Sequence, residues 1–227
     1  MTELIVALDG AQPVDLMFRL NAIGIRWFKV GPLTELDGRS LDKLDGLSGS
    51  RVISDSLKFN LFRDAKLADH GPYVISEYVK RLADKGYAAV STSTDEATMT
   101  AVNAAMHFPP SIWKHIAPTS QKPIGEDIVI RVKRALDQGV DGVILSAHDV
   151  PLIKQYAFNH GLVTVCPGIR LFEDQDEQNL VMSGHYRTAV PERCVVRGVD
   201  FAVVGRPIHA SSDPELAAKR YLSALRG

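Results

Sequence analysis

The chain alternates between short runs of consecutive apolar residues and longer segments in which apolar residues recur at helical spacing. Runs that are apolar throughout are typical of strands buried on both faces of a parallel sheet. We expect strands at Leu4–Leu8, Trp27–Val30, Phe59–Lys66, Ala88–Ser91, Ile112–Ala117, Gly142–Leu145, Val163–Val165 and Phe201–Val204, with Val52–Asp55 as an additional extended candidate.

Helical segments fall between these runs, and several of them end at a glycine. The pattern predicts helices at Val14–Ala22, 41–47, Val74–Asp84, Ala97–Met106, Ile128–Gln138, Leu152–His160, somewhere in Glu177–Val190, and Glu215–Leu225. About eight strands that alternate with about eight helices favour an α/β fold, a single (β/α)8 TIM barrel over residues 1–227. A doubly wound open sheet is the second possibility, but no G-x-G-x-x-G follows the first strand to support dinucleotide binding.

Composition narrows the function classes. The 227 residues are 45% hydrophobic with a net charge of −1, which gives no general electrostatic reason to expect nucleic acid or a membrane surface as partner. No apolar run approaches the roughly 18–20 residues that span a bilayer, and the first residues do not resemble a signal peptide. Cys166 and Cys194 form no disulfide framework, so a reduced, cytoplasmic location is expected.

Polar and charged side chains follow the predicted strands. In a barrel, residues at the carboxyl ends of the strands meet on one rim, where active sites lie. The residues at these ends are Asp9, Lys29, Asp64, Lys66, Ser91, Thr119, Ser120, Ser146, Arg170 and Arg206. Opposite charges that converge on one rim predict a site for an anionic ligand.

The last strand runs into Gly205-Arg206, a pattern suited to phosphate. Backbone N–H groups at a glycine can approach a phosphate closely, and arginine can bind it with two parallel hydrogen bonds. The loops after strands seven and eight form the usual phosphate site of this barrel, and the seventh loop adds Arg170 and Gln178, with Gln175 as a substitute for the latter. The alternative for Arg206 is a surface ion pair.

The densest charge cluster is the segment from Asp64 to Asp69. Asp64 and Lys66 are two residues apart on a predicted strand, so they project from the same face, and Asp69 follows the strand end. With Lys29 they form four charges of alternating sign, which would hold one another in place and tune one another's pKa values. A purely structural salt-bridge network is the alternative.

The chain resembles the orotidine 5′-phosphate decarboxylase family. The matching pieces are Ala7-Leu8-Asp9, Phe28-Lys29-Val30-Gly31, Asp64-x-Lys66-x-x-Asp69, Thr119-Ser120, Gly139-Val140-Asp141-Gly142-Val143, Ser146-Ala147-His148, Pro167-Gly168-Ile169-Arg170 and Val203-Val204-Gly205-Arg206-Pro207-Ile208. The resemblance implies conversion of orotidine 5′-monophosphate to UMP and CO₂ without metal or cofactor, in a homodimer with composite active sites.

The resemblance also implies a role for each matching residue. Lys66 would stabilise and protonate the C6 carbanion, Asp64 would face the departing carboxylate, and Asp69 would reach the neighbouring subunit's site. Lys29 would hold the carboxylates in register. Asp9 and Lys29 would contact ribose, Thr119 and Ser120 the pyrimidine edge, and Arg170, Gln178, Gly205 and Arg206 the phosphate.

One segment departs from this family. His70-Gly71-Pro72-Tyr73 replaces the usual residues after the second Asp, and Asp64–Gly71 is closer to 3-keto-L-gulonate 6-phosphate decarboxylase and hexulose 6-phosphate synthase, which are related Mg²⁺ enzymes. Those enzymes carry a glutamate where this chain has Lys29, and a cation there would repel Mg²⁺. The alternatives are therefore a Mg²⁺-dependent sugar-phosphate enzyme and a catalytically silent UMP-binding barrel.

Overall fold

The computed structural model describes residues 1–9, 13–31, 59–67, 72–84, 86–92, 111–116, 126–174 and 187–227. The predicted segments 41–47, Val52–Asp55 and Ala97–Met106 lie outside these residues. The described part contains eight parallel strands that close into one barrel, each strand paired with its neighbours in chain order and β1 paired with β8. The strands are β1 (Glu3–Ala7), β2 (Trp27–Val30), β3 (Asn60–Leu67), β4 (Ala89–Thr92), β5 (Ser111–His115), β6 (Gly142–Ile144), β7 (Val163–Pro167) and β8 (Phe201–Val204).

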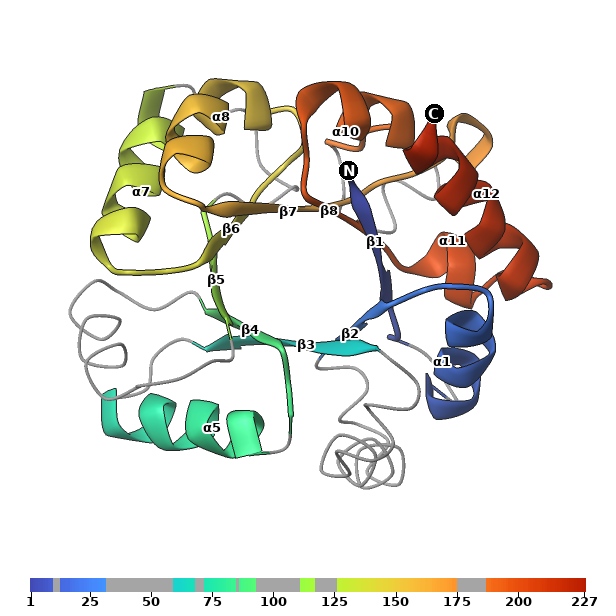
Figure 1. Ribbon diagram of the computed structural model, residues 1–227, viewed down its shortest axis with the longest axis horizontal. Helices are drawn as coiled ribbons and strands as arrows, with labels where there is room; N and C mark the ends of the chain where they lie inside the picture. Colours follow the sequence, from blue (N-terminus) through green and yellow to red (C-terminus); the bar gives the residue numbers. More distant parts are fainter. Residues whose placement is uncertain are drawn as a thin grey trace.

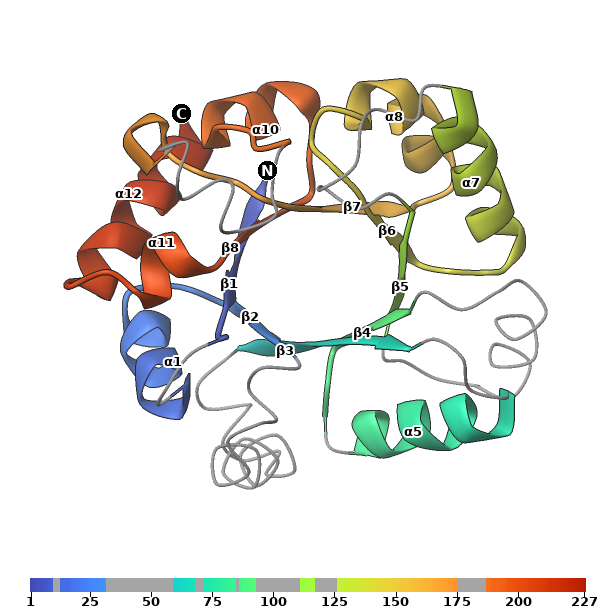
Figure 2. The ribbon, with the colours of Figure 1, turned by 180° about the vertical axis from the view of Figure 1, so that it is seen from behind.

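The helices surround the barrel (Figures 1 and 2). They are α1 (Pro13–Ala22), α5 (Pro72–Asp84), α7 (Glu126–Asp137), α8 (Val150–Asn159), α10 (Pro191–Arg197), α11 (Arg206–His209) and α12 (Pro214–Arg226), with the short 3-10 turn η1 (Phe172–Asp174) after β7. The predicted (β/α)8 barrel is confirmed, and the open doubly wound sheet is wrong because β8 pairs with β1. No helix in the described residues is both long enough and apolar enough to cross a membrane.

The seventh β-α unit contains a helix that was not predicted. α10 begins at Pro191, after an extended Val190 with φ −78° and ψ 152°, and most of Glu177–Val190, where a helix was expected, is not described. Proline suits the first turn of a helix because it has no N–H to leave unpaired there. Residues 175–186 lie outside the described part of the chain.

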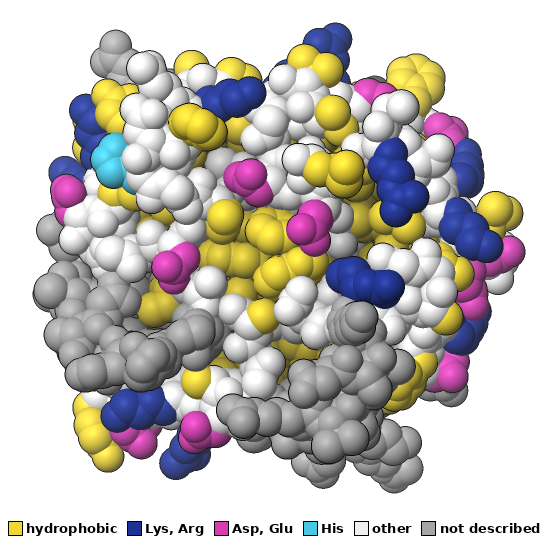
Figure 3. Space-filling view, viewed as in Figure 1, with side chains coloured by type: hydrophobic (Ala, Val, Ile, Leu, Met, Phe, Trp, Pro, Cys, Tyr) yellow, Lys and Arg dark blue, Asp and Glu magenta, His cyan; other side chains and the backbone are white. Residues whose placement is uncertain are grey.

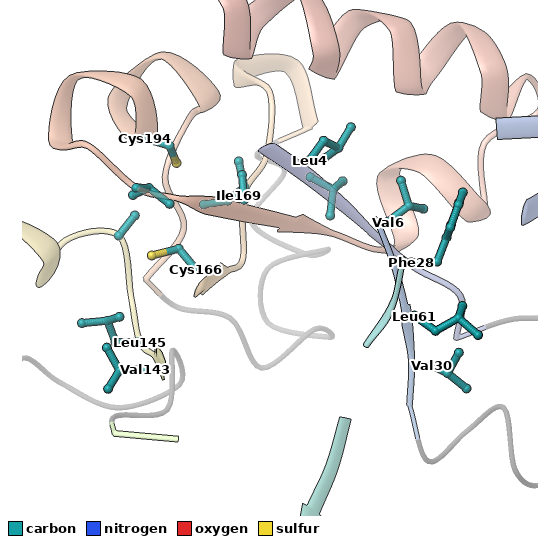
Figure 4. Packing of buried hydrophobic residues seen from close by; sticks show 14 of the residues in the cluster. Leu4, Val6, Phe28, Val30, Leu61, Val143, Leu145, Cys166, Ile169 and Cys194 are labelled. Carbon is teal, nitrogen blue, oxygen red and sulfur yellow. The ribbon is translucent and has the colours of Figure 1, made fainter. Parts of the chain in front are cut away.

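The strands bury both of their faces. The outward face packs against the helices, and Figure 4 shows part of this layer, with Val6 and Phe28 on β1 and β2 and with Cys166 and Cys194 on β7 and α10. The inward face forms a second cluster inside the barrel, which contains Ile5, Ala7, Phe62, Ala89, Trp113, Ile144, Val165 and Val203. Because side chains alternate along a strand, two consecutive apolar residues serve two different layers. This explains why the strands are apolar throughout.

Aromatic rings fill one end of the barrel interior. The Trp113 ring centroid lies 4.6 Å from Phe62, 5.3 Å from Phe201 and 5.6 Å from Trp27. Figure 3 shows hydrophobic side chains at the centre of this view down the barrel, with acidic side chains around them. The interior is therefore a packed core of side-chain layers rather than a pore. Residues two positions further along each strand form the next layer, at the carboxyl end.

Candidate active site

Four strands carry polar side chains immediately above the packed interior. Lys29 follows Trp27 by two residues on β2, Asp64 follows Phe62 on β3, Ser91 follows Ala89 on β4, and His115 follows Trp113 on β5. The alternation of a strand directs each of these side chains inward, on top of its apolar predecessor. The sequence therefore builds a polar layer at the carboxyl ends of adjacent strands, where barrel enzymes carry their active sites.

Lys29 joins two carboxylates that come from different strands. Its Nζ donates a 3.0 Å hydrogen bond to Asp64 Oδ2 and lies 3.3 Å from Asp9 Oδ2. Burial acts to lower the pKa of Lys29, but the carboxylates of Asp64 and Asp9 outweigh that effect, so the net pKa is raised and the ammonium stays charged. Of the predicted cluster, the described side chains show the contact between Lys29 and Asp64, and Asp9 joins it from β1.

Asp64 is the most heavily hydrogen-bonded carboxylate of this layer. Besides Lys29 on Oδ2, its Oδ1 accepts a 2.7 Å hydrogen bond from Ser91 Oγ and lies 3.3 Å from His115 Nε2. Asp64 is only 5% exposed. His115 was not predicted as a site residue. The signal that could have found it is its position two residues after Trp113, which places it on the inward face of a strand.

The two carboxylate oxygens of Asp9 have different surroundings. Its Oδ2 faces Lys29, while its Oδ1 is buried and has no hydrogen-bond partner among the described residues. A Cβ atom on Gly31 would collide with this Oδ1, so the absence of a side chain at Gly31 leaves room for the carboxylate. A buried acceptor without a donor is costly, and a hydroxyl of a bound ligand would satisfy it.

Two arginines lie together at the other side of the rim. Arg170, after β7, is 6% exposed, and its Nε has no hydrogen-bond partner among the described residues. Burial lowers the pKa of Arg170, and the nearby guanidinium of Arg206 lowers it further. Two like charges near each other, one on a buried and one on an exposed side chain, favour an anion between them.

His209 lies between the two ends of this rim. It sits on α11, directly after β8, and its imidazole Nε2 lies 4.0 Å from the point that a Cβ of Gly205 would occupy. Burial lowers the pKa of His209, with Asp9 acting to raise it and Arg206 and Lys29 acting to lower it. The sequence pattern did not indicate His209, because a helix of four residues is too short to give a periodic signal.

The connection that follows β7 is anchored at its far end. Arg187 makes a bidentate ion pair with Asp149, with distances of 2.6 and 2.7 Å, and both side chains are largely buried. His148 Nε2 lies 2.8 Å from the Thr188 carbonyl oxygen. These contacts tie the segment before α10 to the β6–α8 connection, beside the strand ends that carry the site.

Several predicted site residues cannot be placed in this geometry. Lys66 lies on β3, two residues after Asp64, but its side chain is outside the described part of the structure. Asp69, Thr119, Ser120 and Gln178 are outside it altogether. Within the described residues, no group of three or more His, Cys, Asp or Glu side chains could hold a metal ion.

Comparison with known proteins assigns the family. The profile of the Orotidine 5′-phosphate decarboxylase / HUMPS family matches residues 2–221. The chain belongs to this family. A relative named Orotidine 5′-phosphate decarboxylase from Carboxydothermus hydrogenoformans is 30% identical, covering 99% of this chain and 96% of its own length. Another protein of that name, from Methylococcus capsulatus, is 28% identical over 99% and 92% of the two chains.

Solved structures of the family share the fold. Orotidine 5′-monophosphate decarboxylase from Methanocaldococcus jannaschii, complexed with inhibitor BMP, superposes with a TM-score of 0.74 at 17% identity, with full coverage of both chains. An uncharacterized conserved protein from Geobacillus kaustophilus gives a TM-score of 0.71 at 19% identity, with 98% of this chain and 99% of that chain covered. At these identities the structures support the barrel, and the curated relatives carry the family assignment.

Proposed function

We propose that the protein decarboxylates orotidine 5′-monophosphate to UMP and CO₂. The observation that carries the proposal is the ion-paired group of Asp9, Lys29 and Asp64 on the rim. Asp64 lies two residues before Lys66 on β3. Membership of the orotidine 5′-phosphate decarboxylase family and the names of its nearly full-length relatives support the same reaction.

In the proposed reaction the bond between C6 of the pyrimidine and its carboxylate breaks, and the electron pair remains on C6. The Lys66 ammonium stabilises this carbanion and then transfers its proton to C6, while CO₂ departs. A fixed cation is most effective where charge develops in a site that excludes water. Asp64 faces the departing carboxylate, so the repulsion between the two groups ends when CO₂ leaves.

The remainder of the rim binds the nucleotide. Arg170, Arg206 and Gly205 hold the phosphate, together with Gln178 or Gln175. The paired arginines and the unpartnered Arg170 Nε support this assignment. Asp9 and Lys29 bind ribose hydroxyls, and the unpartnered Asp9 Oδ1 supports that contact. Thr119 and Ser120 bind the pyrimidine edge. Phosphate binding far from C6 supplies free energy that orients the reacting group.

A homodimer completes each site in this proposal, with Asp69 reaching into the neighbouring subunit. At the start of α5, close to Asp69 in the chain, Tyr73 is 78% exposed and Val74 is 54% exposed, and exposed apolar residues of this kind suit a subunit interface. Mixing Lys66→Ala with Asp69→Ala subunits should regenerate one intact site per heterodimer. Failure to recover activity would contradict the shared site.

A Mg²⁺-dependent sugar-phosphate enzyme of the same family is the second candidate. It is favoured by the segment Asp64–Gly71, which resembles that branch. Lys29 argues against it, because its ammonium already lies between the carboxylates of Asp9 and Asp64, where a divalent cation would have to compete with it.

The deciding experiment follows the pyrimidine absorbance of orotidine 5′-monophosphate with EDTA present. Turnover that is lost in Lys66→Ala supports the proposal. An inert EDTA-treated protein that turns over a sugar phosphate after Mg²⁺ is added would establish the second candidate. Tight UMP binding without turnover of either substrate would identify a silent nucleotide-binding barrel.

We place the enzyme in the reducing cytoplasm, since both of its cysteines are free.

A further inference from the structure

The orientation of the Asp64 carboxylate is fixed from three sides. Lys29 on β2 engages Oδ2, while Ser91 on β4 and His115 on β5 converge on Oδ1. A carboxylate held only by Lys29 could rotate about its Cβ–Cγ bond, because that torsion is broad. Donors on both oxygens remove this freedom. His115 makes this contact from the greatest distance in the sheet, because β4 lies between its strand, β5, and β3.

The surroundings of His115 determine where its ring can lie. Trp113, two residues earlier on the same inward face, is 2% exposed and packs against Phe62. Ser91 pairs with Trp113 in the sheet, so the Ser91 hydroxyl lies between β3 and the imidazole. The His115 side chain is 22% exposed, whereas that of Asp64 is 7% exposed. The partly exposed His115 side chain therefore borders the site next to Asp64.

From this geometry we infer that His115 is a positioning residue for decarboxylation, holding Asp64 Oδ1 so that the carboxylate faces the scissile carboxylate of the substrate. This inference rests on the proposed function. Nε2–H donates to Asp64, with Ser91 as a second donor to the same oxygen. Hydrogen bonds to an ionised acceptor are stronger than neutral ones, and small displacements of a reacting geometry have large effects on rate.

The inference makes a prediction that separates positioning from packing. Asp64 acts on the carboxylate, which orotidine 5′-monophosphate has and UMP lacks. Loss of the His115 contact should therefore lower kcat while UMP binds as before. A residue that only supported the fold would change the stability and both ligand properties together.

The test compares His115→Leu, which removes the donor, with His115→Gln, whose amide N–H can reach Asp64. We expect His115→Leu to lower kcat by roughly 10- to 100-fold, with the Kd for UMP within about twofold of the native value, and His115→Gln to recover most of the loss. The control is His160→Leu. His160 is exposed at the end of α8, hydrogen-bonds only locally to the Tyr156 carbonyl, and should leave kcat unchanged.

A kcat for His115→Leu within twofold of native would overturn the inference, as would a parallel loss of UMP affinity or no recovery in His115→Gln. If His115→Leu does not fold, His115→Ala, which also removes the donor, replaces it under the same criteria. A second measurement is independent of turnover: ¹⁵N NMR should show His115 protonated at Nε2, and Asp64→Ala should shift that resonance. If the native protein shows this shift but does not turn over orotidine 5′-monophosphate, the proposed function is refuted and the contact between His115 and Asp64 stands. If the resonance does not shift, the contact is refuted.

Discussion

Lys29 donates to Asp64 although the two residues are not neighbours in the sheet. The register pairs Lys29 with Phe62, two residues before Asp64, and the Nζ of Lys29 is nevertheless 3.0 Å from Asp64 Oδ2. The long lysine side chain therefore extends from the level of the packed interior to the layer above it. Phe62, level with Lys29 in the register and two residues before Asp64, belongs to the aromatic core below the charged layer. The charges of the site consequently rest on a rigid apolar base.

Replacing Lys29 with methionine should destabilise the protein strongly. The carboxylates of Asp9 and Asp64 would remain largely buried without their ammonium, and removing one partner of a buried ion pair costs about 3–5 kcal/mol. Turnover should also be lost. Urea unfolding measures the first effect. Lys80→Met is the matched control, because Lys80 forms an exposed pair with Glu77 and should change the free energy of unfolding by about 0.5 kcal/mol or less. Equal effects of the two variants would contradict the buried network.

Gly31→Ala should impair the site through Asp9. The new methyl group would collide with Asp9 Oδ1, so this carboxylate must move away from Lys29 and from the ribose it is proposed to bind. We expect kcat/KM to fall by about tenfold, which corresponds to roughly 1.4 kcal/mol, mainly through KM. Gly161→Ala provides the comparison, because its φ of +64° strains the backbone while nothing lies within 4 Å. It should lower stability and leave KM unchanged. An unchanged KM in Gly31→Ala would argue against ribose binding by Asp9.

Acid should destabilise the protein partly through His209. Burial lowers the folded-state pKa of His209 below its ordinary value of 6.5, aided by Arg206 and Lys29 and opposed by Asp9. The unfolded chain then takes up this proton first as the pH falls. The stabilising contribution is therefore complete above pH 6.5 and is lost as the pH falls through the folded pKa. His209→Gln should lose less stability than native protein between pH 7.5 and 5.5, as measured by urea unfolding. Identical losses would show that His209 does not titrate in this way.

Bound UMP should offset part of the lowering of the His209 pKa. A phosphate dianion beside Arg206 would raise the pKa of the neighbouring His209, so binding near pH 6 should take up a fraction of a proton. Calorimetry of UMP binding in two buffers of different ionisation enthalpy measures the uptake. The uptake should be smaller in His209→Gln. An uptake that is equal in both proteins would assign the proton to another group.

Neither cysteine should react with a thiol reagent in the native protein. Cys166 and Cys194 are fully buried, and burial raises the pKa of both thiols, that of Cys194 to about 12. Since the thiolate is the reactive form, a thiol reagent at pH 8 should titrate no thiol in native protein and two in urea. A thiol that reacts quickly without denaturant would indicate that α10 opens away from β7.

The strands could be predicted because burial on both faces leaves a continuous apolar run. Each of the eight expected barrel strands is present, with its ends within two residues of the prediction, whereas Val52–Asp55 lies outside the described residues. The approach of Asp9, Lys29 and Asp64 could also be predicted, because all three follow apolar strands that end on one rim. The position of His115 on the inward face of β5 could have been predicted in the same way, but its contact with Asp64 could not, since that contact crosses an intervening strand and depends on the register of β3, β4 and β5. Local pattern carries no information on register between strands.

The pairing of β1 with β8 also constrains how the protein reaches its native state. Glu3 lies beside Phe201, and Arg19 of α1 forms a bidentate contact with Glu215 of α12, 196 positions away in the chain. Contacts of such long range are slow to form, because a long loop must close before they contribute any stability. Asp9 and Arg206, which follow adjacent strands across this seam, cannot lie on the same rim until β8 has been synthesised. During translation the nascent chain therefore has no complete rim, and nucleotide binding should appear only in the last stage of folding.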